Sequence, residues 1–500
     1  MARLVTDYLE ETARRFPEKT AYEDQNHSIT FRQLREGAFH VASGLIEKNI
    51  FRRPAVVYMD KCVECIAAFM GAAYSGNFYT PIDTTMPSQR VDKIVNALKP
   101  AVILTDEEHL SRAKELFPGI ETLLYEELQH NAVDEKAVLE ITARVIDTDI
   151  LYILFTSGST GTPKGVIISH RSAVDYTDWI TTRFNFDETT VIGNQAPLYF
   201  DLSIQDVYAP LRTGCTTELV PGSLFAFPKK VMTYLVEKNV NAIIWVPTAL
   251  CLMANMKALT LDKLPELRIV LFCGEVMPNK QLNIWRKAYP QTTFVNLYGP
   301  TEACDACSYY VVDREFADDE PLPIGKPCEN TDILVLNEKD ELVTGDEIGE
   351  LCIRGSSLAN GYYNDPEKTV AAFVQNPLNS CYPELIYRTG DLVRYNSYGE
   401  LDYVSRKDFQ IKHLGYRIEL GEIETVISSI DGVELNCCLY NQPKKRIELF
   451  YTGTVDKKEL MAKAAVMLPE YMLPAKYNFL EEMPRNLNGK IDRQALKGNL

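Results

Sequence analysis

Residues 156–165 are all Gly, Ser, Thr, Pro or Lys, and they follow an apolar run from Ile150 to Phe155. A buried strand that feeds a small, hydroxyl-rich loop suits phosphate, because glycine lets backbone N–H groups approach an anion and hydroxyls add donors. Lys164 adds a compact positive charge. The loop is not a Walker A loop, since Gly165 follows the lysine where that motif requires Ser or Thr. The sequence predicts a phosphate-binding loop of another kind; a flexible surface loop is the alternative.

The elements around this loop alternate between strand-like and helix-like runs, a pattern that indicates βαβ units and largely parallel sheets. Ligands bind at the carboxyl ends of the strands in such sheets. A helix over 4–13 and a hairpin over 20–31 precede the alternation. The expected strands are 55–58, 101–104, 150–155, 190–192, 242–246, 269–272 and 293–296. The expected helices are 65–73, 88–97, 172–182, 230–238, 248–256 and those beginning at 204 and 280.

The sequence pattern changes from about residue 320, where strand-like runs become short and turns become frequent. Runs at 333–336, 350–354 and 399–404 predict a small antiparallel barrel or sandwich. We place a domain boundary near 406–408, and the remaining residues predict a compact α+β unit. Five hundred residues exceed what one hydrophobic core holds, which also predicts two or more domains.

The formal net charge is −17, from 52 basic and 69 acidic residues. Phosphate contacts need clustered Lys and Arg, so this composition argues against nucleic acid as a partner. No segment approaches the ~18 uninterrupted apolar residues of a membrane span, and the first residues lack the features of a signal peptide. We therefore expect a cytoplasmic protein without a membrane span.

Two C-x-x-C pairs stand among the twelve cysteines, Cys62/Cys65 and Cys304/Cys307. Together they could imitate a four-thiolate zinc site, but they lie much farther apart than the pairs of short zinc modules. Cys62 and Cys65 fall at helical spacing in an apolar run, which favours burial as small apolar residues. Without a secretion signal, all twelve thiols are expected to be reduced.

Four further motifs join the loop: Tyr298–Glu302, Tyr387–Asp391, Ser405–Arg417 and Asn488–Asp492. Together with the loop, and in this order, they resemble the motifs of the adenylate-forming enzymes, which include acyl-CoA synthetases, luciferases and the adenylation domains of nonribosomal peptide synthetases. The resemblance covers essentially the whole chain. Three more stretches, Phe200–Ser203, Phe272–Val276 and Asp408–Lys412, resemble the amino-acid-activating branch and, within it, the D-alanine–carrier protein ligases.

This resemblance implies a fold and a domain division. The expected fold is α/β: an N-terminal domain of two doubly wound α/β lobes plus a small β-barrel over 1–407, and a small, mobile α+β domain over 408–500. Asp408 would be the hinge. Ser405 departs from the family, which usually has glycine before Arg406, and this puts the local backbone geometry in question rather than the assignment.

The implied reaction has two halves and needs ATP and Mg²⁺. A substrate carboxylate attacks the α-phosphate of ATP to give an acyl-adenylate and pyrophosphate, and a thiol then attacks the adenylate to form a thioester. Positioning and charge neutralisation should dominate, because no covalent enzyme intermediate is required. The resemblance makes Lys490, Thr301 and Glu302 the catalytic residues. Thr301 would contact the α-phosphate region, and Glu302 would hold Mg²⁺, a hard cation that prefers oxygen ligands.

The resemblance also assigns the nucleotide contacts. The 156–165 loop would hold the β- and γ-phosphates, Gly299 would let the backbone approach the adenine, and Asp391 would accept hydrogen bonds from the ribose hydroxyls. Arg406 would reach the ribose or a phosphate. The assigned ATP-binding residues are Thr156, Ser157, Gly158, Ser159, Thr160, Gly161, Lys164, Gly274, Glu275, Asn296, Tyr298, Gly299, Asp391 and Arg406.

Asp201 occupies the motif position that binds the α-ammonium group in amino-acid-activating relatives. A buried carboxylate needs a charged partner, which argues against a fatty acid. Gln205 and Asp305 depart from the D-alanine ligases: if Asp305 faces the pocket, a polar or cationic substrate side chain fits, and if it faces solvent, D-alanine fits best. The expected pocket is Asp201, Leu202, Gln205, Trp245, Leu271, Cys273, Leu297, Asp305 and Ala306.

The expected partners are an amino acid and a separate phosphopantetheinylated carrier protein, and we expect a monomer. Lys444, Lys445 and Arg446 are candidates for docking an acidic carrier protein, although a solvated charged turn explains them better. His170 is expected to be structural. The rival functions are a CoA ligase for a small carboxylic acid, a luciferase-like oxygenase and a nucleotide-binding protein without catalysis.

Overall fold

A computed structural model describes residues 2–158, 162–260, 264–485 and 491–497. The chain forms two compact units. The first comprises Met1–Thr84, Leu98–Leu154 and Val166–Lys407, and the second comprises Thr85–Ala97, Phe155–Gly165 and Asp408–Leu500. One break falls at Lys407/Asp408, where we predicted the hinge, but two short upstream segments also join the second unit. A mobile second domain therefore stays a prediction.

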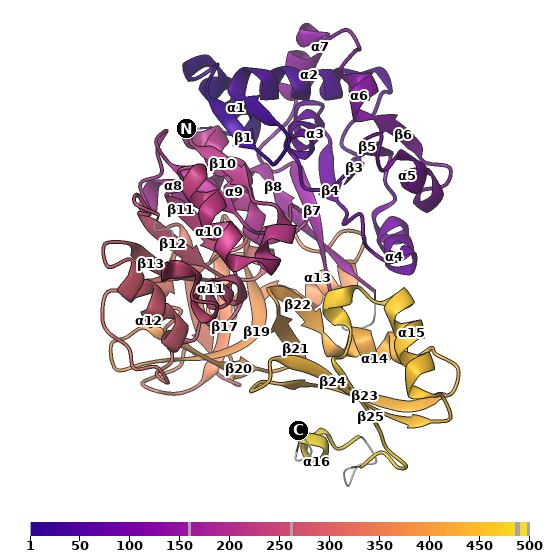
Figure 1. Ribbon diagram of the computed structural model, residues 1–500, viewed down its shortest axis with the longest axis vertical. Helices are drawn as coiled ribbons and strands as arrows, with labels where there is room; N and C mark the ends of the chain where they lie inside the picture. The colour runs from indigo at the N-terminus through magenta and orange to yellow at the C-terminus, as the bar shows by residue number, and fades with distance from the viewer. Residues whose placement is uncertain (1, 159–161, 261–263, 486–490, 498–500) are drawn as a thin grey trace. The chain divides into compact units, whose positions relative to one another are not determined.

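A nine-stranded sheet dominates the first unit (Figure 1). Its middle is parallel from β1 through β10, β9, β11 and β12 to β13, and antiparallel strands β2, β14 and β15 complete its edges. The strand bounds are β1 Thr20–Glu23, β2 Ser28–Thr30, β9 Val191–Asn194, β10 Thr216–Leu219, β11 Ala242–Trp245, β12 Ile269–Phe272, β13 Thr293–Tyr298, β14 Ser308–Val311 and β15 Lys326–Pro327.

A six-stranded sheet forms the other lobe, in the order β6-β5-β3-β4-β7-β8. The pairs β6–β5, β5–β3, β3–β4 and β4–β7 are parallel, as the alternation of strands and helices predicts. The bounds are β3 Pro54–Tyr58, β4 Phe78–Pro81, β5 Val102–Thr105, β6 Glu121–Leu124, β7 Ile150–Thr156 and β8 Lys164–Ser169.

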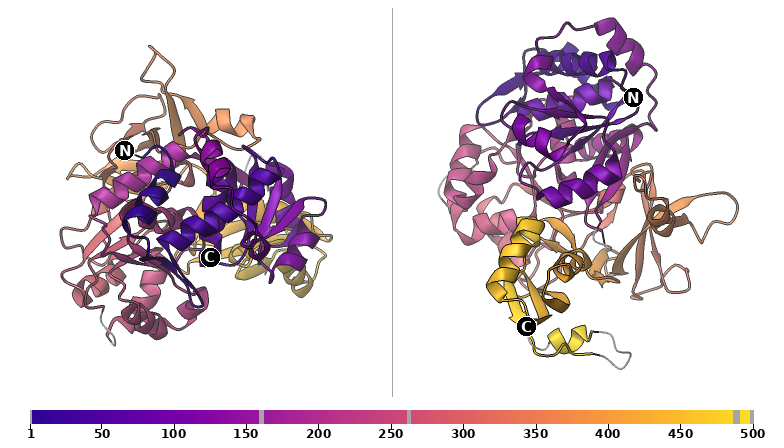
Figure 2. Two further views of the ribbon diagram at one scale, coloured as in Figure 1. Left: turned by 90° about the horizontal axis from the view of Figure 1, so that it is seen from above. Right: turned by 90° about the vertical axis from the view of Figure 1, so that its right-hand side faces the viewer.

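Helices α2 and α3 lie side by side next to the six-stranded sheet (Figure 1), and Figure 2 shows them in indigo and violet. Their close approach requires glycine at Gly71, because a Cβ there would lie 2.5 Å from the Cβ of Val41. Helix α4 Ser88–Leu98 belongs almost wholly to the second unit. The helices of these lobes are α1 Val5–Arg15, α2 Phe31–Glu47, α3 Val63–Tyr74, α5 Leu110–Leu116, α6 Tyr125–Leu128, α7 Glu135–Thr142, α8 His170–Arg183, α9 Ile204–Thr213, α10 Pro228–Glu237, α11 Pro247–Asn255 and α12 Asn279–Ala288.

A five-stranded antiparallel sheet follows the two lobes and forms a half-barrel. Its strands β19 and β20 pair so that Asp391 lies opposite Arg406. The bounds are β16 Thr331–Leu336, β17 Gly349–Gly355, α13 Pro366–Ala372, β18 Phe373–Gln375, β19 Leu385–Tyr395 and β20 Leu401–Arg406. The predicted fold class is confirmed: α/β, with two doubly wound lobes, a small barrel, which is a half-barrel here, and a small α+β C-terminal part.

The second unit has its own core around Ile423, Leu449 and Leu460. Arg90 of α4 forms an almost fully buried ion pair with Glu422 of α14 inside this unit. Its elements after residue 407 are β21 Gln410–His413, β22 Tyr416–Glu419, α14 Leu420–Ser428, β23 Val433–Asn441, β24 Arg446–Gly453, α15 Lys457–Met467, β25 Lys476–Phe479 and α16 Arg493–Lys497. Among the described residues of the whole chain, no helix is both long enough and apolar enough to cross a bilayer.

Candidate active site

Three residues predicted to bind nucleotide meet at one carboxylate, that of Asp391. The Tyr298 hydroxyl donates to Asp391 Oδ2, and Arg406 Nη1 donates to Asp391 Oδ1 at 2.7 Å. The second Arg406 nitrogen, Nη2, donates to the carbonyl oxygen of Thr389 at 3.0 Å. Tyr298 and Asp391 come from separate sheets, at the end of β13 and in the middle of β19, so only the tertiary fold brings them together.

This arrangement fits a ribose. Each carboxylate oxygen has two lone pairs, so Asp391 can still accept two hydroxyl donors after Tyr298 and Arg406 have donated one each. Burial and the neighbouring Asp391 charge hold the pKa of Tyr298 well above its usual range, so its hydroxyl stays a donor. Arg406 therefore fixes the carboxylate that is expected to hold the ribose.

A second cluster joins the residues expected at the α-phosphate and at the substrate ammonium group. The Thr301 hydroxyl donates to Asp201 Oδ2, although the two residues are 100 positions apart in the chain. The other Asp201 oxygen accepts the Leu202 backbone N–H at 2.9 Å, which fixes the side chain on a 3₁₀ turn over Asp201–Ser203. Beside Thr301, the fully buried Glu302 accepts a hydrogen bond from Tyr362 at 2.6 Å.

Glu302 has the chemistry of a magnesium ligand, because its carboxylate offers the oxygen atoms that Mg²⁺ prefers. Glu302 would hold the ion, and a bound Mg²⁺ would supply charge neutralisation at the phosphates. Tyr362 orients the Glu302 carboxylate through its hydroxyl.

A third cluster surrounds Asp305, whose orientation the sequence left open. Asp305 is 3% exposed, so it does not face solvent. The Tyr176 hydroxyl lies 2.8 Å from Asp305 Oδ2 and 2.9 Å from Gln205 Oε1, and Gln205 Nε2 donates to the Leu202 carbonyl at 2.5 Å. Burial and the Asp305 charge raise the pKa of Tyr176 well above its usual range. One tyrosine thus links the two residues that depart from the D-alanine ligase pattern.

The turn that carries Asp305 explains why residue 299 is glycine. A Cβ on Gly299 would lie 2.3 Å from the Asp305 carbonyl oxygen and 2.6 Å from the Ala306 Cα. Cys304 and Asp305 both adopt left-handed backbone conformations, with φ of 54° and 84°, which are uncommon outside glycine. Glycine is therefore needed for packing here, in addition to the approach of adenine that the resemblance implies.

The predicted phosphate loop is described only in part, and it belongs to the second unit. Thr156 Oγ1 is buried and has no hydrogen-bond partner among the described residues. Ser157 Oγ donates to the Arg417 carbonyl at 2.5 Å. A Cβ on Gly158 would lie 2.1 Å from the Thr162 carbonyl oxygen, so position 158 requires glycine. Four predicted residues lie outside the described residues: Ser159, Thr160, Gly161 and Lys490.

Other predicted nucleotide residues have structural partners in this state. Glu275 accepts hydrogen bonds from Thr248 N at 2.9 Å and Thr248 Oγ1 at 2.5 Å, at the start of α11. Asn296 donates to the Pro323 carbonyl at 2.8 Å. Gly274 has a φ of 96°, a conformation that favours glycine.

The remaining predicted pocket residues are apolar and buried. The Trp245 indole N–H donates to the Gly193 carbonyl at 2.8 Å, and its ring meets Phe225 edge-on at 5.2 Å. These contacts fix Trp245 in the core. The other buried residues of this set are Leu202, Leu271, Cys273, Leu297 and Ala306.

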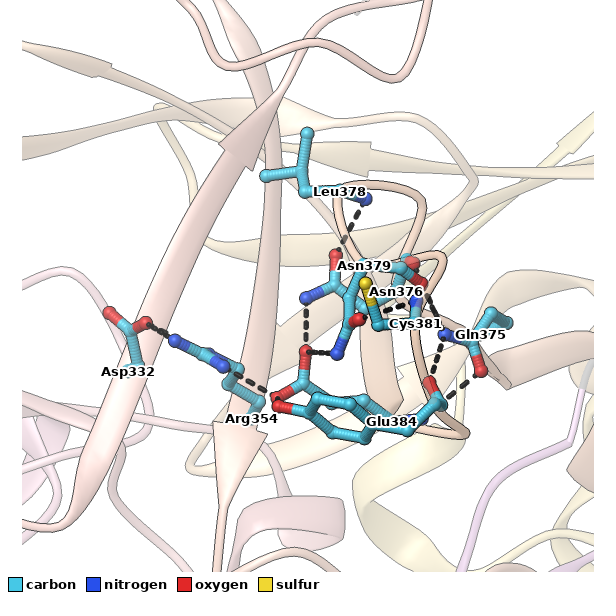
Figure 3. Close-up of polar contacts among 9 residues, drawn as sticks. Asp332, Arg354, Gln375, Asn376, Leu378, Asn379, Cys381 and Glu384 are labelled. Carbon is cyan, nitrogen blue, oxygen red and sulfur yellow. Dashed lines mark hydrogen bonds and ion pairs between the residues drawn. The ribbon is translucent and has the colours of Figure 1, made fainter.

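A group of polar side chains in contact is not by itself a functional site. The half-barrel contains an example, drawn in Figure 3. Arg354 bridges Asp332 Oδ2 at 2.9 Å and Glu384 Oε1 at 2.6 Å. Asn376 and Asn379 donate to the other Glu384 oxygen at 2.6 and 3.2 Å, and they lower the pKa of this carboxyl. These contacts close the loop between β18 and β19, so we attribute the cluster to loop ordering.

Sequence reasoning missed Tyr176 and Tyr362, which lie in no motif that it recognised. Both act through hydroxyls on carboxylates that are distant in sequence, Asp305 and Glu302. Tyr176 follows Asp175 on α8, whose sequence has the pattern of an ordinary amphipathic helix. No local signal therefore identifies Tyr176 as a site residue. His170, at the start of the same helix, is buried, and burial lowers its pKa to about 4, which agrees with a structural role.

Family comparison agrees with this geometry. The model of the AMP-binding enzyme family matches residues 9–363, so the chain belongs to that family. This finding confirms the resemblance to adenylate-forming enzymes.

Individual relatives and a solved structure show which members of the family the chain is similar to. The chain is 30% identical over 502 residues to D-alanine–D-alanyl carrier protein ligase of Lacticaseibacillus casei, covering 98% of this chain and 97% of the relative. It is 31% identical over 508 residues to delta-poly-L-ornithine synthetase of Acinetobacter baumannii, covering 99% of this chain but only 36% of that relative. In fold it resembles the Vibrio cholerae adenylation domain AlmE in complex with glycyl-adenosine-5'-phosphate, with a TM-score of 0.84 at 22% identity over 100% of this chain and 98% of that one.

Proposed function

We propose that this chain activates an amino acid with ATP as an aminoacyl-adenylate and transfers it to the phosphopantetheine thiol of a carrier protein. One observation carries the proposal. Thr301, expected at the α-phosphate, donates a hydrogen bond to Asp201, expected at the substrate ammonium group. This contact connects the phosphate and amino-acid subsites, as in-line attack of a carboxylate on the α-phosphate requires.

Each residue has a defined part in this proposal. Asp201 binds the α-ammonium group and thereby turns the substrate carboxylate toward the α-phosphate. Asp391 binds the ribose, the loop around Thr156 and Lys164 binds the phosphates that leave as pyrophosphate, and Glu302 holds Mg²⁺. Lys490, on a domain that rotates about Asp408, stabilises the charge that develops on the reacting oxygens.

The buried Asp305 favours a substrate with a polar or cationic side chain. A carboxylate in the interior forms a charge-assisted hydrogen bond with an ammonium or amide donor, an interaction that an alkyl group cannot offer. Gln205, linked to Asp305 through Tyr176, adds an amide to the same region. D-Alanine, the substrate named for the Lacticaseibacillus relative, is the alternative.

The deciding experiment is ATP–pyrophosphate exchange across a panel of D- and L-amino acids. The proposal expects exchange to depend on an amino acid, with the highest kcat/KM for a polar or cationic one. Lys490→Ala should abolish exchange but spare thioester formation from preformed adenylate, whereas Lys497→Ala, an exposed lysine near the same end, should leave exchange unchanged. Normal exchange in Lys490→Ala would overturn the role given to this lysine.

A CoA ligase of a small carboxylic acid would use the same motifs and is the second candidate. Incubation with ATP, substrate and either free CoA or a phosphopantetheinylated carrier protein separates the two, with the thioester product identified by mass. Monomeric state and cytoplasmic location stay predictions. Of the proposed carrier-docking residues, Lys444 and Lys445 are exposed on the β23–β24 turn, while Arg446 pairs with Glu448 at 2.8 Å.

A further inference from the structure

The pair Cys62/Cys65 plays no part in the activity described above, yet its two sulfurs are in contact. Cys62 is the N-cap of α3 and Cys65 lies in its first turn. The two Sγ atoms are 3.7 Å apart. A disulfide bond is about 2.05 Å long, so the sulfurs need to approach by only about 1.7 Å to bond.

The two thiols differ in access. Cys62 is half-buried, whereas Cys65 is 3% exposed and its thiol donates to the Asp60 carbonyl oxygen at 3.1 Å. An external oxidant therefore reaches Cys62 first, and Cys65 is held behind it in contact. This is the arrangement of an attacking thiol and a resolving thiol.

We propose that Cys62 and Cys65 form a redox-sensitive dithiol that a low-molecular-weight disulfide oxidises to an internal disulfide. The Cys62 thiolate attacks one sulfur of the oxidant, forms a mixed disulfide and releases one small thiol. Cys65 then attacks Cys62 Sγ, forms the Cys62–Cys65 bond and releases the second small thiol. The protein loses two protons and two electrons, and the oxidant is reduced to two thiols.

The reaction is expected to be slow but its product stable. The hydrogen bond to Cys65 and burial hold the pKa of Cys62 above its usual range, which keeps the thiolate fraction small at neutral pH. A pair whose thiolate is not stabilised has the more negative reduction potential, because stabilising the reduced form is what makes a dithiol strongly oxidising. Equilibrium redox titration is therefore the appropriate measurement.

The dithiol adjoins a chain of contacts that leads to the amino-acid pocket. Lys61, directly before Cys62, donates from Nζ to the Val220 carbonyl at 2.7 Å and to Asn194 Oδ1 at 3.0 Å. Asn194 in turn donates to Asp206 Oδ2 at 2.5 Å, and Asp206 follows Gln205 on α9. Closing the disulfide moves the backbone beside Lys61, so oxidation is expected to weaken amino-acid binding. This coupling rests on the proposed function.

The test equilibrates the purified chain in graded ratios of oxidised to reduced glutathione, alkylates free thiols and maps the cysteines by mass. The starting protein carries Cys381→Ser, which removes the one exposed cysteine. We expect a Cys62–Cys65 disulfide without retained glutathione. Cys65→Ser should instead keep a glutathione adduct on Cys62, and Cys62→Ser should not react at this helix. The fully buried Cys304/Cys307 pair, of identical spacing, is the internal control and should stay reduced.

Two outcomes would overturn the proposal: Cys62 and Cys65 stay reduced at the highest ratio, or Cys304/Cys307 oxidises equally. The coupling has a separate readout. Oxidation should raise the amino-acid KM about fivefold or more while leaving the ATP KM unchanged, and dithiothreitol should reverse it. A disulfide without this change in KM would refute the coupling through Lys61. The mass readout needs no activity, so it stands even if the proposed function fails.

Discussion

Asp391 and Asp305 are both buried carboxylates of the candidate active site, but they accept hydrogen bonds from different kinds of donor. Asp391 accepts from the Arg406 guanidinium at 2.7 Å as well as from Tyr298. Asp305 accepts from the hydroxyl of Tyr176 at 2.8 Å. An arginine guanidinium thus contacts the carboxylate on the nucleotide side, and a tyrosine hydroxyl contacts the carboxylate on the amino-acid side.

The difference follows from what each carboxylate is expected to bind. Ribose hydroxyls are neutral, so a carboxylate that binds them needs its charge compensated by the protein itself. A cationic substrate brings its own compensating charge, and a charge-assisted hydrogen bond is about twice as strong as a neutral one. A neutral tyrosine can orient Asp305 without competing for that interaction. Four predictions test this contrast, in order of decreasing effect.

The largest effect is expected from Asp391→Ala. The substitution leaves the Arg406 guanidinium, 11% exposed, without its carboxylate, and breaking a buried pair from one side costs about 3 kcal/mol. Urea denaturation should show this loss, and the ATP KM in pyrophosphate exchange should rise. Asp346→Ala, at an exposed position, should change stability by no more than about 0.5 kcal/mol. Unchanged stability in Asp391→Ala would remove the nucleotide half of the contrast.

Asp305→Asn should come next, acting on substrate choice. The amide keeps the shape but removes the charge, so the interaction with a cationic amino acid should weaken by about 2–3 kcal/mol, and kcat/KM for that substrate should fall roughly 30- to 150-fold. The ATP KM should stay the same. Asp313→Asn is a matched control, since this exposed aspartate also accepts from a tyrosine, Tyr310, at 3.0 Å. If Asp305→Asn uses the parent's preferred amino acid with an unchanged kcat/KM, Asp305 does not select the substrate side chain.

Acid should affect the amino-acid side first, through His170 on the helix that also carries Tyr176. Burial lowers the pKa of His170 to about 4 from 6.5, so the unfolded chain binds the proton more tightly. The stabilisation by the neutral imidazole is complete above pH 6.5 and is lost as the pH falls toward 4. Between pH 7.5 and pH 5 this amounts to about 2 kcal/mol.

His170→Asn should flatten that part of the pH dependence, as measured by urea denaturation at each pH. His130→Asn, at an exposed position, should leave it as it is. As the pH is lowered, the amino-acid KM of the parent should rise before the ATP KM does. An identical pH dependence in parent and His170→Asn would contradict the assignment to this residue.

The smallest effect is expected from Tyr298→Phe. It removes one hydrogen bond to Asp391 but leaves the Arg406 pair, so the ATP KM should rise by about 1 kcal/mol, roughly fivefold. Amino-acid KM should not change. Tyr398→Phe, 70% exposed, is the control. A rise in the ATP KM as large as that of Asp391→Ala would mean that Tyr298, rather than Arg406, compensates the negative charge of Asp391.

The sequence alone determined the fold class and the family. Strand and helix periodicities are local, so the expected elements of the two lobes lie within a few residues of those observed, as for β12 at Ile269–Phe272. The ordered motifs predicted an adenylate-forming enzyme, which the family comparison confirms. The domain division and the individual site residues stay predictions, and Lys490 lies outside the described residues.

Only the tertiary structure decided the orientation of Asp305 and the partners of the site carboxylates. Whether an aspartate after a Tyr-Gly-Pro-Thr-Glu motif points inward depends on two left-handed residues and on close packing at Gly299, neither of which has a sequence period. Tyr176 meets Asp305 across 129 positions and Tyr362 meets Glu302 across 60. Periodicity reports which face of an element is buried, whereas hydrogen bonds between distant elements depend on how those faces meet.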